Sequence, residues 1–402
     1  MSSELATATK PRKILILTAD AGFGHRSVAN AVASALELEY GSAVEVSIVN
    51  PLDDEKAPLV LRDSQADYDK WVKNVPELYQ LGYNASDAFI PTRILQSYLS
   101  VALLEVMRSI LRQYKPDAVL STYPMYQSAI ITLFRSRKYR VPFYTVVTDL
   151  ATVHRLWFHP GVDGLLVPNQ LVADLAMSNQ VKGEKIRITE IPVSPAIANE
   201  KRNKADIRME LGWQADLPTV LAVGSKRVER LVDALNVVNH YGVPLQVVAV
   251  TGNDQDLFNE LNHFDWHIPA HIYAFVENMA PLLRASDLII CKAGGLIVTE
   301  SLASGLPLLL IEAIPGQETG NADYVTSRGA GDMAQSPVAI LETVHHLFKD
   351  YAALLKERAR NACSLGMDQA AFDAAHILWK AANERPKPTP RKKILPVLEI
   401  PL

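Results

Sequence analysis

The sequence has few cysteines, no long apolar run and little net charge, and each of these absences removes a class of protein. Only Cys291 and Cys363 are present among 402 residues, so a disulfide framework is excluded and a reducing compartment fits. No run of about 18 apolar residues occurs, and residues 1–11 lack the apolar core of a signal peptide, so we expect a soluble or peripheral protein. A net charge of −4 gives no general attraction to nucleic acid, and no such partner is expected.

The residues that are present suffice for two hydrophobic cores. The chain is 49% apolar and 21% charged, and its length fits two domains of ordinary size. Short apolar runs alternate with helical spacing in both halves, which predicts an α/β protein with two doubly wound parallel sheets. Residues 198–206 are polar and charged, as linkers are, so we place the domain boundary near residue 200. The predicted domains are 12–199 and 200–384, preceded by a disordered 1–11 and followed by an extended tail, 385–402.

Residues 288–329 carry the clearest functional pattern. An apolar strand is followed by the glycine pair Gly294 and Gly295, a helical register and a second apolar strand. Such a turn directs free backbone N–H groups and the positive end of a helix toward a crevice, which suits a diphosphate. Glu300 on the helix could accept hydrogen bonds from ribose hydroxyls, and the loop 315–321 is dense in groups that bind sugar hydroxyls. The alternative is an ordinary βαβ turn followed by a solvated loop.

A second glycine loop follows the apolar run 13–19. Gly22 and Gly24 match the start of a dinucleotide fingerprint, but Ser27 stands where the third glycine would be, so the evidence for NAD is weak. The loop also places His25 at a helix N-terminus, where the helix dipole disfavours imidazolium. A neutral histidine beside a crevice is a competent general base near pH 7. The alternative is a histidine that caps its own helix.

The least regular part of the first half is residues 52–112, which we treat as an insertion that faces a membrane. Asp67 and Asp69 form a D-x-D pattern, but no apolar strand precedes them and we predict no metal there. Residues 94–111 are apolar around much more than half of a helix circumference. Such a helix either lies in the core, which is the commoner case, or belongs to an amphipathic flap on a bilayer.

Three strings resemble those of glycosyltransferase family 28. They read K-A-G-G-L-x-V-x-E from Lys292, I-P-G-Q-E-x-G-N from Ile314 and V-T-D-L-x-T-x-H-x-x-W-F-H from Val147. They are most similar to the branch that holds monogalactosyldiacylglycerol synthases and processive diacylglycerol glucosyltransferases. The resemblance implies a GT-B architecture of two Rossmann-like domains facing across a cleft, a UDP-galactose or UDP-glucose donor, and a diacylglycerol acceptor. It also places His25 on the acceptor side, although Phe23 replaces a glycine of the family's loop.

A carboxylate follows the strand predicted at 143–147. Asp149 could orient His25, raise its basicity or be the base itself. His154 and His159 join Asp149 in an inventory of metal ligands, but their spacing matches no zinc motif. We therefore rank acceptor contacts first, structural roles second and a metal third.

The first turn of the second domain departs from the family pattern. Residues 224–227 hold one glycine where relatives have several, and Lys226 and Arg227 could contact the diphosphate instead. By resemblance, the backbone near Phe275 and Val276 pairs with uracil; the alternative is a capped helix start.

The combined interpretation is an inverting hexosyltransferase that uses one in-line displacement and neither a metal nor a cofactor. His25, or Asp149 through or beside it, takes the acceptor proton, while helix-end N–H groups stabilise the leaving diphosphate. The expected nucleotide-binding residues are Gly224, Ser225, Lys226, Phe275, Val276, Lys292, Ala293, Gly294, Gly295 and Glu300. The expected donor-sugar residues are Pro315, Gly316, Gln317, Glu318 and Asn321. The expected acceptor residues are Gly22, Phe23, Gly24, Tyr123, Pro124, Thr152, His154 and Trp157.

Two other functions stay open at this point. One is a nucleotide-sugar epimerase on the same architecture, and the other is a noncatalytic UDP-sugar binding module, which the low glycine content of 224–227 suggests. We expect the protein in the cytoplasm, bound peripherally to the inner face of the cell membrane. The tail 385–402 combines basic and apolar residues and could contact anionic lipid.

Overall fold

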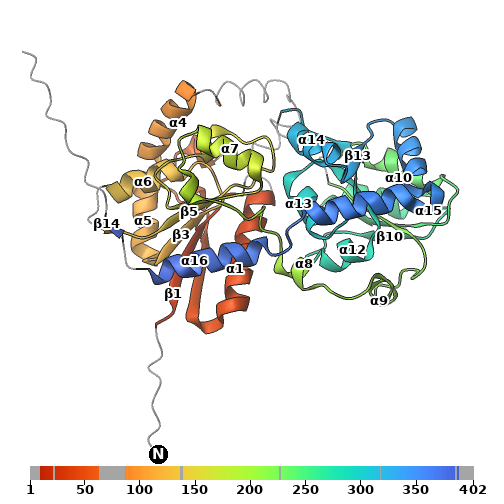
Figure 1. The fold of residues 1–402 in the computed structure, drawn as a ribbon, viewed down its shortest axis with the longest axis horizontal. Helices are drawn as coiled ribbons and strands as arrows, with labels where there is room; N and C mark the ends of the chain where they lie inside the picture. The colour runs from red at the N-terminus through yellow and green to blue at the C-terminus, as the bar shows by residue number, and fades with distance from the viewer. Residues whose placement is uncertain are drawn as a thin grey trace, which may run out of the picture.

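The computed structural model describes residues 10–20, 23–62, 87, 89–135, 139–225, 228–316, 318–384 and 387–388. Within them the chain forms two parallel six-stranded sheets with helices packed around each (Figure 1). The expected α/β class with two doubly wound sheets is therefore confirmed. Several residues of interest lie outside the described part: Gly22, Asp67, Asp69, Lys226, Arg227, Gln317 and the tail from 389 onward.

The first sheet has the strand order β2-β1-β3-β5-β6-β7. Its strands are β1 Arg12–Leu17, β2 Val44–Val49, β3 Ala118–Ser121, β5 Phe143–Val146, β6 Gly164–Val167 and β7 Ile186–Ile188. Its main helices are α1 Phe23–Tyr40, α5 Leu104–Tyr114, α6 Gln127–Arg135 and α7 Gln170–Ser178. Helices cover both faces, which is why the central strands are continuous apolar runs with every residue of β3 and β6 buried.

The second sheet has the order β10-β9-β8-β11-β12-β13. Its strands are β8 Thr219–Val223, β9 Gln246–Val250, β10 Ala270–Tyr273, β11 Leu288–Lys292, β12 Leu308–Glu312 and β13 Gly331–Met333. Its helices are α9 Lys204–Glu210, α10 Leu231–Asn239, α11 Gln255–Asn262, α12 Ala280–Ala285, α13 Gly295–Ala303, α14 Thr319–Ser327 and α15 Pro337–Leu365, the last broken at residues 349–352. The strand order reverses between β8 and β11, as it does between β1 and β3 in the first sheet. Ligands of open α/β sheets bind beyond the strand ends at such points.

The two sheets are joined by a short helix and by the end of the chain. After β7, the helix α8 Pro195–Asn199 leads to α9 of the second sheet. The last helix, α16 Ala370–Asn383, returns and runs along α1 (Figure 1). Trp379 stacks on Tyr40 there, with ring centroids 4.3 Å apart. The strand β14, Lys387–Pro388, then pairs with β4, Tyr139–Arg140, at the first domain.

Residues 94–111 form parts of two helices instead of one. They belong to α4 Phe89–Ala102 and α5, which meet at Leu103 with a bend of 53°. The bend lets Leu103 and Met107 enter the core while Ile94 and Val101 stay exposed. The apolar residues of this segment therefore lie partly in the core and partly on the surface. Among the described residues no single helix is long and apolar enough to cross a membrane; the bent pair meets the requirement of length and composition only when its two helices are counted together.

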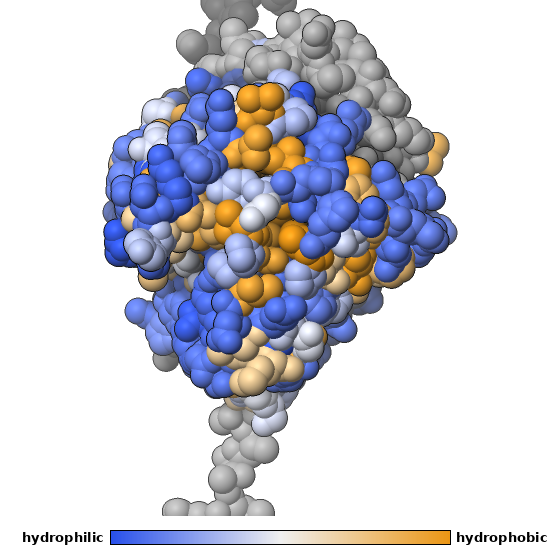
Figure 2. Space-filling model, turned by 90° about the vertical axis from the view of Figure 1, so that its right-hand side faces the viewer, coloured by the Kyte–Doolittle hydropathy of each residue, from blue (hydrophilic) through white to orange (hydrophobic). Residues whose placement is uncertain are grey.

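Exposed apolar residues occur on both domains. On α4, Ile94, Tyr98 and Val101 are 66%, 49% and 77% exposed, and their spacing places them on one face of the helix. The outer end of the second domain is largely hydrophilic with an apolar group in its middle (Figure 2). Exposed apolar residues of this domain include Val338 and Tyr351 on α15.

Candidate active site

The segments with the predicted site residues meet where the two sheets face each other. His25 lies in the first turn of α1, which follows β1, Tyr123 follows β3, and residues 148–152 follow β5. In the second domain, α13 and α14 lie on the side that faces the first domain (Figure 1). The strand ends at both reversal points thus contribute to one region.

His25 is held on two sides by threonine hydroxyls. Its Nδ1 lies 2.8 Å from Oγ1 of Thr148, and Thr122 Oγ1 donates to its backbone oxygen at 3.1 Å. The rings of Tyr123 and His25 pack in a T-shaped arrangement, with centroids 4.9 Å apart. Burial lowers the pKa of His25 to about 4, because removal from water disfavours the charged form. The imidazole is therefore neutral at physiological pH.

Asp149 does not hold the imidazole as the sequence suggested. Its Oδ2 accepts a hydrogen bond of 2.6 Å from Trp157 Nε1, while the neighbouring Thr148 contacts His25. Burial raises the pKa of Asp149 to about 6, and the Trp157 hydrogen bond opposes this rise.

The other expected acceptor residues differ in how open they are. Among the described residues, nothing lies within 4 Å of where a side chain on Gly24 would start, so these residues leave room beside the His25 loop. Trp157 is 1% exposed and donates its indole N–H to Asp149, and its ring centroid lies 6.0 Å from that of His25. His154 is buried, and its Nδ1 accepts from Leu156 N at 3.0 Å as the cap of a short helical turn. Pro124 is half-buried beside Tyr123, and of Phe23 only the backbone is described, as the first residue of α1.

The donor turn of the second domain is built on Gly294 and Gly295. Gly294 is the N-cap of α13, so the first backbone N–H groups of the helix have no intrahelical acceptor and can bind an anion. Lys292 pairs with Glu318 at 2.6 Å, and the second oxygen of Glu318 accepts from Ile314 N. This arrangement joins the turn to the loop that precedes α14.

Two further contacts hold the donor turn. Asn321 Nδ2 donates to the backbone oxygen of Ala293 at 3.0 Å, and both residues are buried. A Cβ at Gly294 would lie 3.6 Å from Glu318 Oε1, so the glycine pair and the loop that follows β12 are adjacent. Of the expected sugar-binding residues, Pro315 is exposed, and Gly316 has a φ of 83°, which favours glycine.

Glu300 lies on α13 and is half-buried. Burial raises the pKa of its carboxyl to about 7. Among the described residues its carboxylate has no hydrogen-bond or ion-pair partner, which leaves its oxygens available for a ligand.

The remaining nucleotide-binding candidates surround the end of β8. Gly224 has no room for a side chain, since a Cβ would lie 2.5 Å from Leu231 and 2.7 Å from Leu257. Ser225 is half-buried in the turn that follows. Phe275 and Val276 lie beyond β10, and Phe275 is 63% exposed.

The two halves of the site touch. A Cβ on Gly295 would lie 3.5 Å from the carbonyl oxygen of Thr148, and one on Gly320 would lie 2.2 Å from Oγ1 of Thr152. These contacts bring the donor turn within van der Waals distance of the loop that holds His25. The structure therefore brings together residues that lie far apart in the chain.

Two residues of the site were not identified from the sequence. The sequence pattern indicates Asp149 and not Thr148, although both residues follow the same strand. Glu312 ends β12 opposite Lys292, and its carboxylate accepts from Glu229 N at 3.0 Å at the turn that precedes α10. A polar residue at the end of a buried strand was the available signal in both cases.

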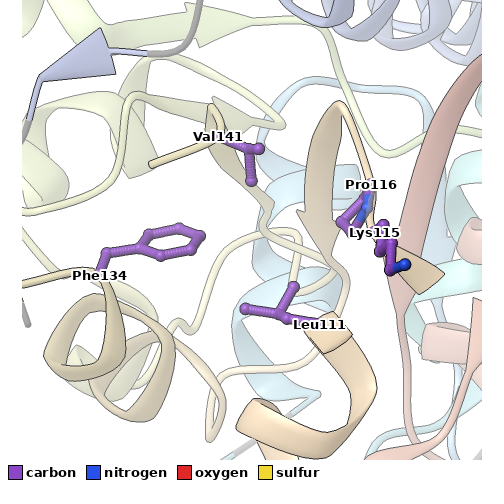
Figure 3. A pocket seen from close by; sticks show the side chains of 5 residues that line it. All are labelled: Leu111, Lys115, Pro116, Phe134 and Val141. Carbon is purple, nitrogen blue, oxygen red and sulfur yellow. The ribbon is translucent and has the colours of Figure 1, made fainter. Parts of the chain in front are cut away.

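The described residues contain no group of three or more histidine, cysteine or carboxylate side chains placed to hold a metal ion. A hollow of about 230 Å³ is lined by Leu111, Lys115, Pro116, Phe134 and Val141 (Figure 3). Residues 115, 116 and 141 precede β3 and β5, so the hollow lies at the amino ends of these strands, whereas His25 lies beyond the carboxyl end of β1.

Each half of the chain matches a known protein family. The family described as Monogalactosyldiacylglycerol (MGDG) synthase matches residues 25–193, and the Glycosyltransferase family 28 C-terminal domain matches residues 219–375. The probable monogalactosyldiacylglycerol synthase, chloroplastic, of Glycine max is 32% identical over 389 residues, which cover 94% of this chain and 72% of the relative. Monogalactosyldiacylglycerol synthase 2, chloroplastic, of Arabidopsis thaliana is 31% identical over 391 residues, covering 94% and 82%.

Solved structures share the fold at much lower identity. MurG of Acinetobacter baumannii aligns with a TM-score of 0.58 and 18% identity over 92% of this chain and 99% of its own. The UDP-GlcNAc 2-epimerase from Neisseria meningitidis, bound to UDP-GlcNAc, aligns with a TM-score of 0.56 and 15% identity over 92% and 100%. The glycosyltransferase SnogD from Streptomyces nogalater also aligns with a TM-score of 0.56. The expected GT-B architecture is thereby confirmed, and the fold by itself does not separate transferases from epimerases.

Proposed function

The chain belongs to the monogalactosyldiacylglycerol synthase family, and from this we propose that it transfers galactose from UDP-galactose to the free hydroxyl of diacylglycerol. It is a UDP-sugar-dependent hexosyltransferase that acts on diacylglycerol. Galactose is proposed over glucose because the Glycine max and Arabidopsis thaliana relatives are named for a galactolipid product.

The proposed reaction is one displacement at the anomeric carbon. The acceptor oxygen forms a bond to this carbon as the bond to the diphosphate oxygen breaks, and the configuration inverts from α to β. The acceptor proton passes to the neutral ring of His25. The electron pair of the broken bond leaves with UDP, whose growing charge faces the N-terminus of α13 at Gly294 and Gly295.

One observation carries this proposal. Thr148, whose hydroxyl lies within hydrogen-bond distance of the His25 ring, also lies against Gly295 through its backbone oxygen. A base and a diphosphate-binding turn are therefore close enough for one sugar to span them. Proximity of this kind is a large part of enzymatic rate acceleration.

The test is product analysis with purified protein in mixed micelles of detergent and diacylglycerol. UDP-galactose is expected to yield a monogalactosyl lipid with a β linkage, and UDP-glucose is expected to react more slowly. His25→Ala should lower kcat by about 10²- to 10⁴-fold, the usual contribution of a general base. Release of UDP with an epimerised sugar and no lipid product would contradict the proposal.

We also propose that the protein works on a membrane surface, at the inner face of the cell membrane, with α4 as the contact. The exposed side chains of Ile94, Tyr98 and Val101 form an apolar face on this helix. Burying such a face in the interface contributes about 25 cal/mol per Å² of apolar area. Val101→Glu should reduce co-sedimentation with anionic vesicles. Val338→Glu, at an exposed valine of the second domain (66% against 77% for Val101), is the matched control and should not.

A further inference from the structure

We infer that Thr148 is a positioning residue: its hydroxyl accepts the Nδ1–H of His25 and so leaves Nε2 unprotonated for the acceptor hydroxyl. This inference rests on the proposed function, because it assigns a part to the base of that reaction. It differs from the sequence-based expectation, in which Asp149 orients the histidine.

The geometry around the ring supports this assignment. Thr148 is 7% exposed, and its Oγ1 lies 2.8 Å from Nδ1. Thr122 holds the backbone of His25 through the 3.1 Å hydrogen bond to its carbonyl oxygen, so both ends of the residue are anchored. Among the described residues, Nδ1 is the ring nitrogen that has a hydrogen-bond partner. Nε2 is thus the nitrogen left for a substrate.

The function of the base selects the tautomer. A neutral imidazole carries one proton, and the nitrogen that bears it cannot accept another. If Thr148 donated to Nδ1, the proton of His25 would lie on Nε2 and the ring could not take a proton from the acceptor there. A hydroxyl that accepts from Nδ1–H keeps the lone pair on Nε2. In other enzymes too, a hydrogen-bond acceptor at one ring nitrogen sets the tautomer of a catalytic histidine.

A hydroxyl also differs from a carboxylate in its effect on the charge of the His25 ring. A carboxylate at Nδ1 would stabilise imidazolium and raise the pKa of the ring. Asp149 is instead bound to Trp157, and desolvation keeps the pKa of His25 low, at about 4. The base is therefore oriented without being charged in the resting enzyme.

The backbone of Thr148 extends the arrangement to the second domain. Its carbonyl oxygen lies 3.5 Å from where a Cβ on Gly295 would be, at the first residue of α13. The residue that sets the ring of His25 is thus packed against the helix start that faces the diphosphate. Thr148 thus contacts both the base that takes the acceptor proton and the helix start that faces the leaving diphosphate.

The experiment compares three variants in the galactosyl-transfer assay. Thr148→Val removes the hydroxyl with little change of shape and should lower kcat by about 10- to 100-fold, with KM for UDP-galactose within about threefold. Thr148→Ser keeps the hydroxyl and should restore kcat to within about threefold. Thr145→Val is the matched control: Thr145 is a buried threonine of β5 whose hydroxyl has no hydrogen-bond partner among the described residues, and its kcat should equal that of the wild type.

A spectroscopic measurement tests the inference apart from turnover. The protein labelled with ¹⁵N in its histidines reports the tautomer of each ring, and the signals of His25 are those that disappear in His25→Gln. The wild type and Thr148→Ser should show the proton on Nδ1, and Thr148→Val should shift toward the other tautomer. A proton on Nε2 in the wild type, or wild-type kcat in Thr148→Val, would overturn the inference. A wild type without galactolipid product refutes the proposed function instead, and the tautomer then decides the role of Thr148 alone.

Discussion

Glu190 should make the stability of this protein depend strongly on pH. It follows β7, has a φ of 65° and is 2% exposed, and its Oε1 has no hydrogen-bond partner among the described residues. Burial raises the pKa of its carboxyl to about 8. Its charge also contributes to a raised pKa of Tyr324 on α14, after burial of that ring, so the two residues face each other from different domains.

The magnitude follows from linkage between protonation and folding. The folded protein holds the proton of Glu190 up to pH 8, whereas the unfolded chain releases it near 4.5. The contribution is therefore fully present below pH 4.5 and is lost as the pH rises to 8. At about 1.4 kcal/mol per pH unit, the free energy of unfolding should fall by about 5 kcal/mol over this window.

The assay is urea unfolding of the wild type and of Glu190→Gln at pH 5, 6, 7 and 8. Glutamine stays neutral at every pH, so the variant should be close to the wild type at pH 5 and more stable by a growing margin above it. Taking the difference between the two proteins cancels other groups with raised pKa values, such as Glu300 and Asp149. Glu342→Gln, at an exposed glutamate of α15, should follow the wild type. A difference between Glu190→Gln and the wild type that stays constant from pH 5 to 8 would refute the reasoning.

Three further substitutions test the contacts described above. Gly320→Ala places a Cβ 2.2 Å from Thr152 Oγ1 and should lower kcat about 10- to 100-fold by displacing the donor loop. Unchanged steady-state kinetics would show that the two domains do not pack against each other at Gly320 and Thr152. Lys292→Met leaves the buried carboxylate of Glu318 without its cation and should lower the free energy of unfolding in urea by about 3 kcal/mol. Adding Glu318→Gln should restore part of this loss, and no recovery would mean that the pair is not coupled. Trp379→Ala removes the stack of α16 on α1 and should destabilise the first domain by about 2 kcal/mol in the same assay, and equal stability would argue against that docking.

Much of the fold could be predicted from the sequence because parallel strands covered on both faces need continuous apolar runs. The runs at 288–291 and 308–311 are β11 and β12 to within one residue. The prediction was less accurate where packing decides the local structure. The strand predicted at 143–147 is β5, Phe143–Val146, and ends one residue earlier than expected. The bend at Leu103 in the apolar segment 94–111 was not predicted, because periodicity records which residues are apolar and not where the core ends.

The candidate site divides in the same way. The glycine pair at the start of α13 and His25 near the start of α1 were recognisable because a strand, a turn and a helix are contiguous in sequence. The partner of His25 was not recognisable, since Thr148 lies 123 residues away. The choice between Thr148 and its neighbour Asp149 depends on the direction of two side chains at one strand end.

The sequence by itself determined two doubly wound sheets, the turn that faces a diphosphate and the membership in a lipid glycosyltransferase family, because each is written in residues close together in the chain. Only the tertiary structure decided that Thr148 holds His25, that Asp149 holds Trp157 and that Gly295 packs against Thr148. These contacts join segments whose relative positions are set by the packing of helices on two sheets, and no local periodicity encodes such distances.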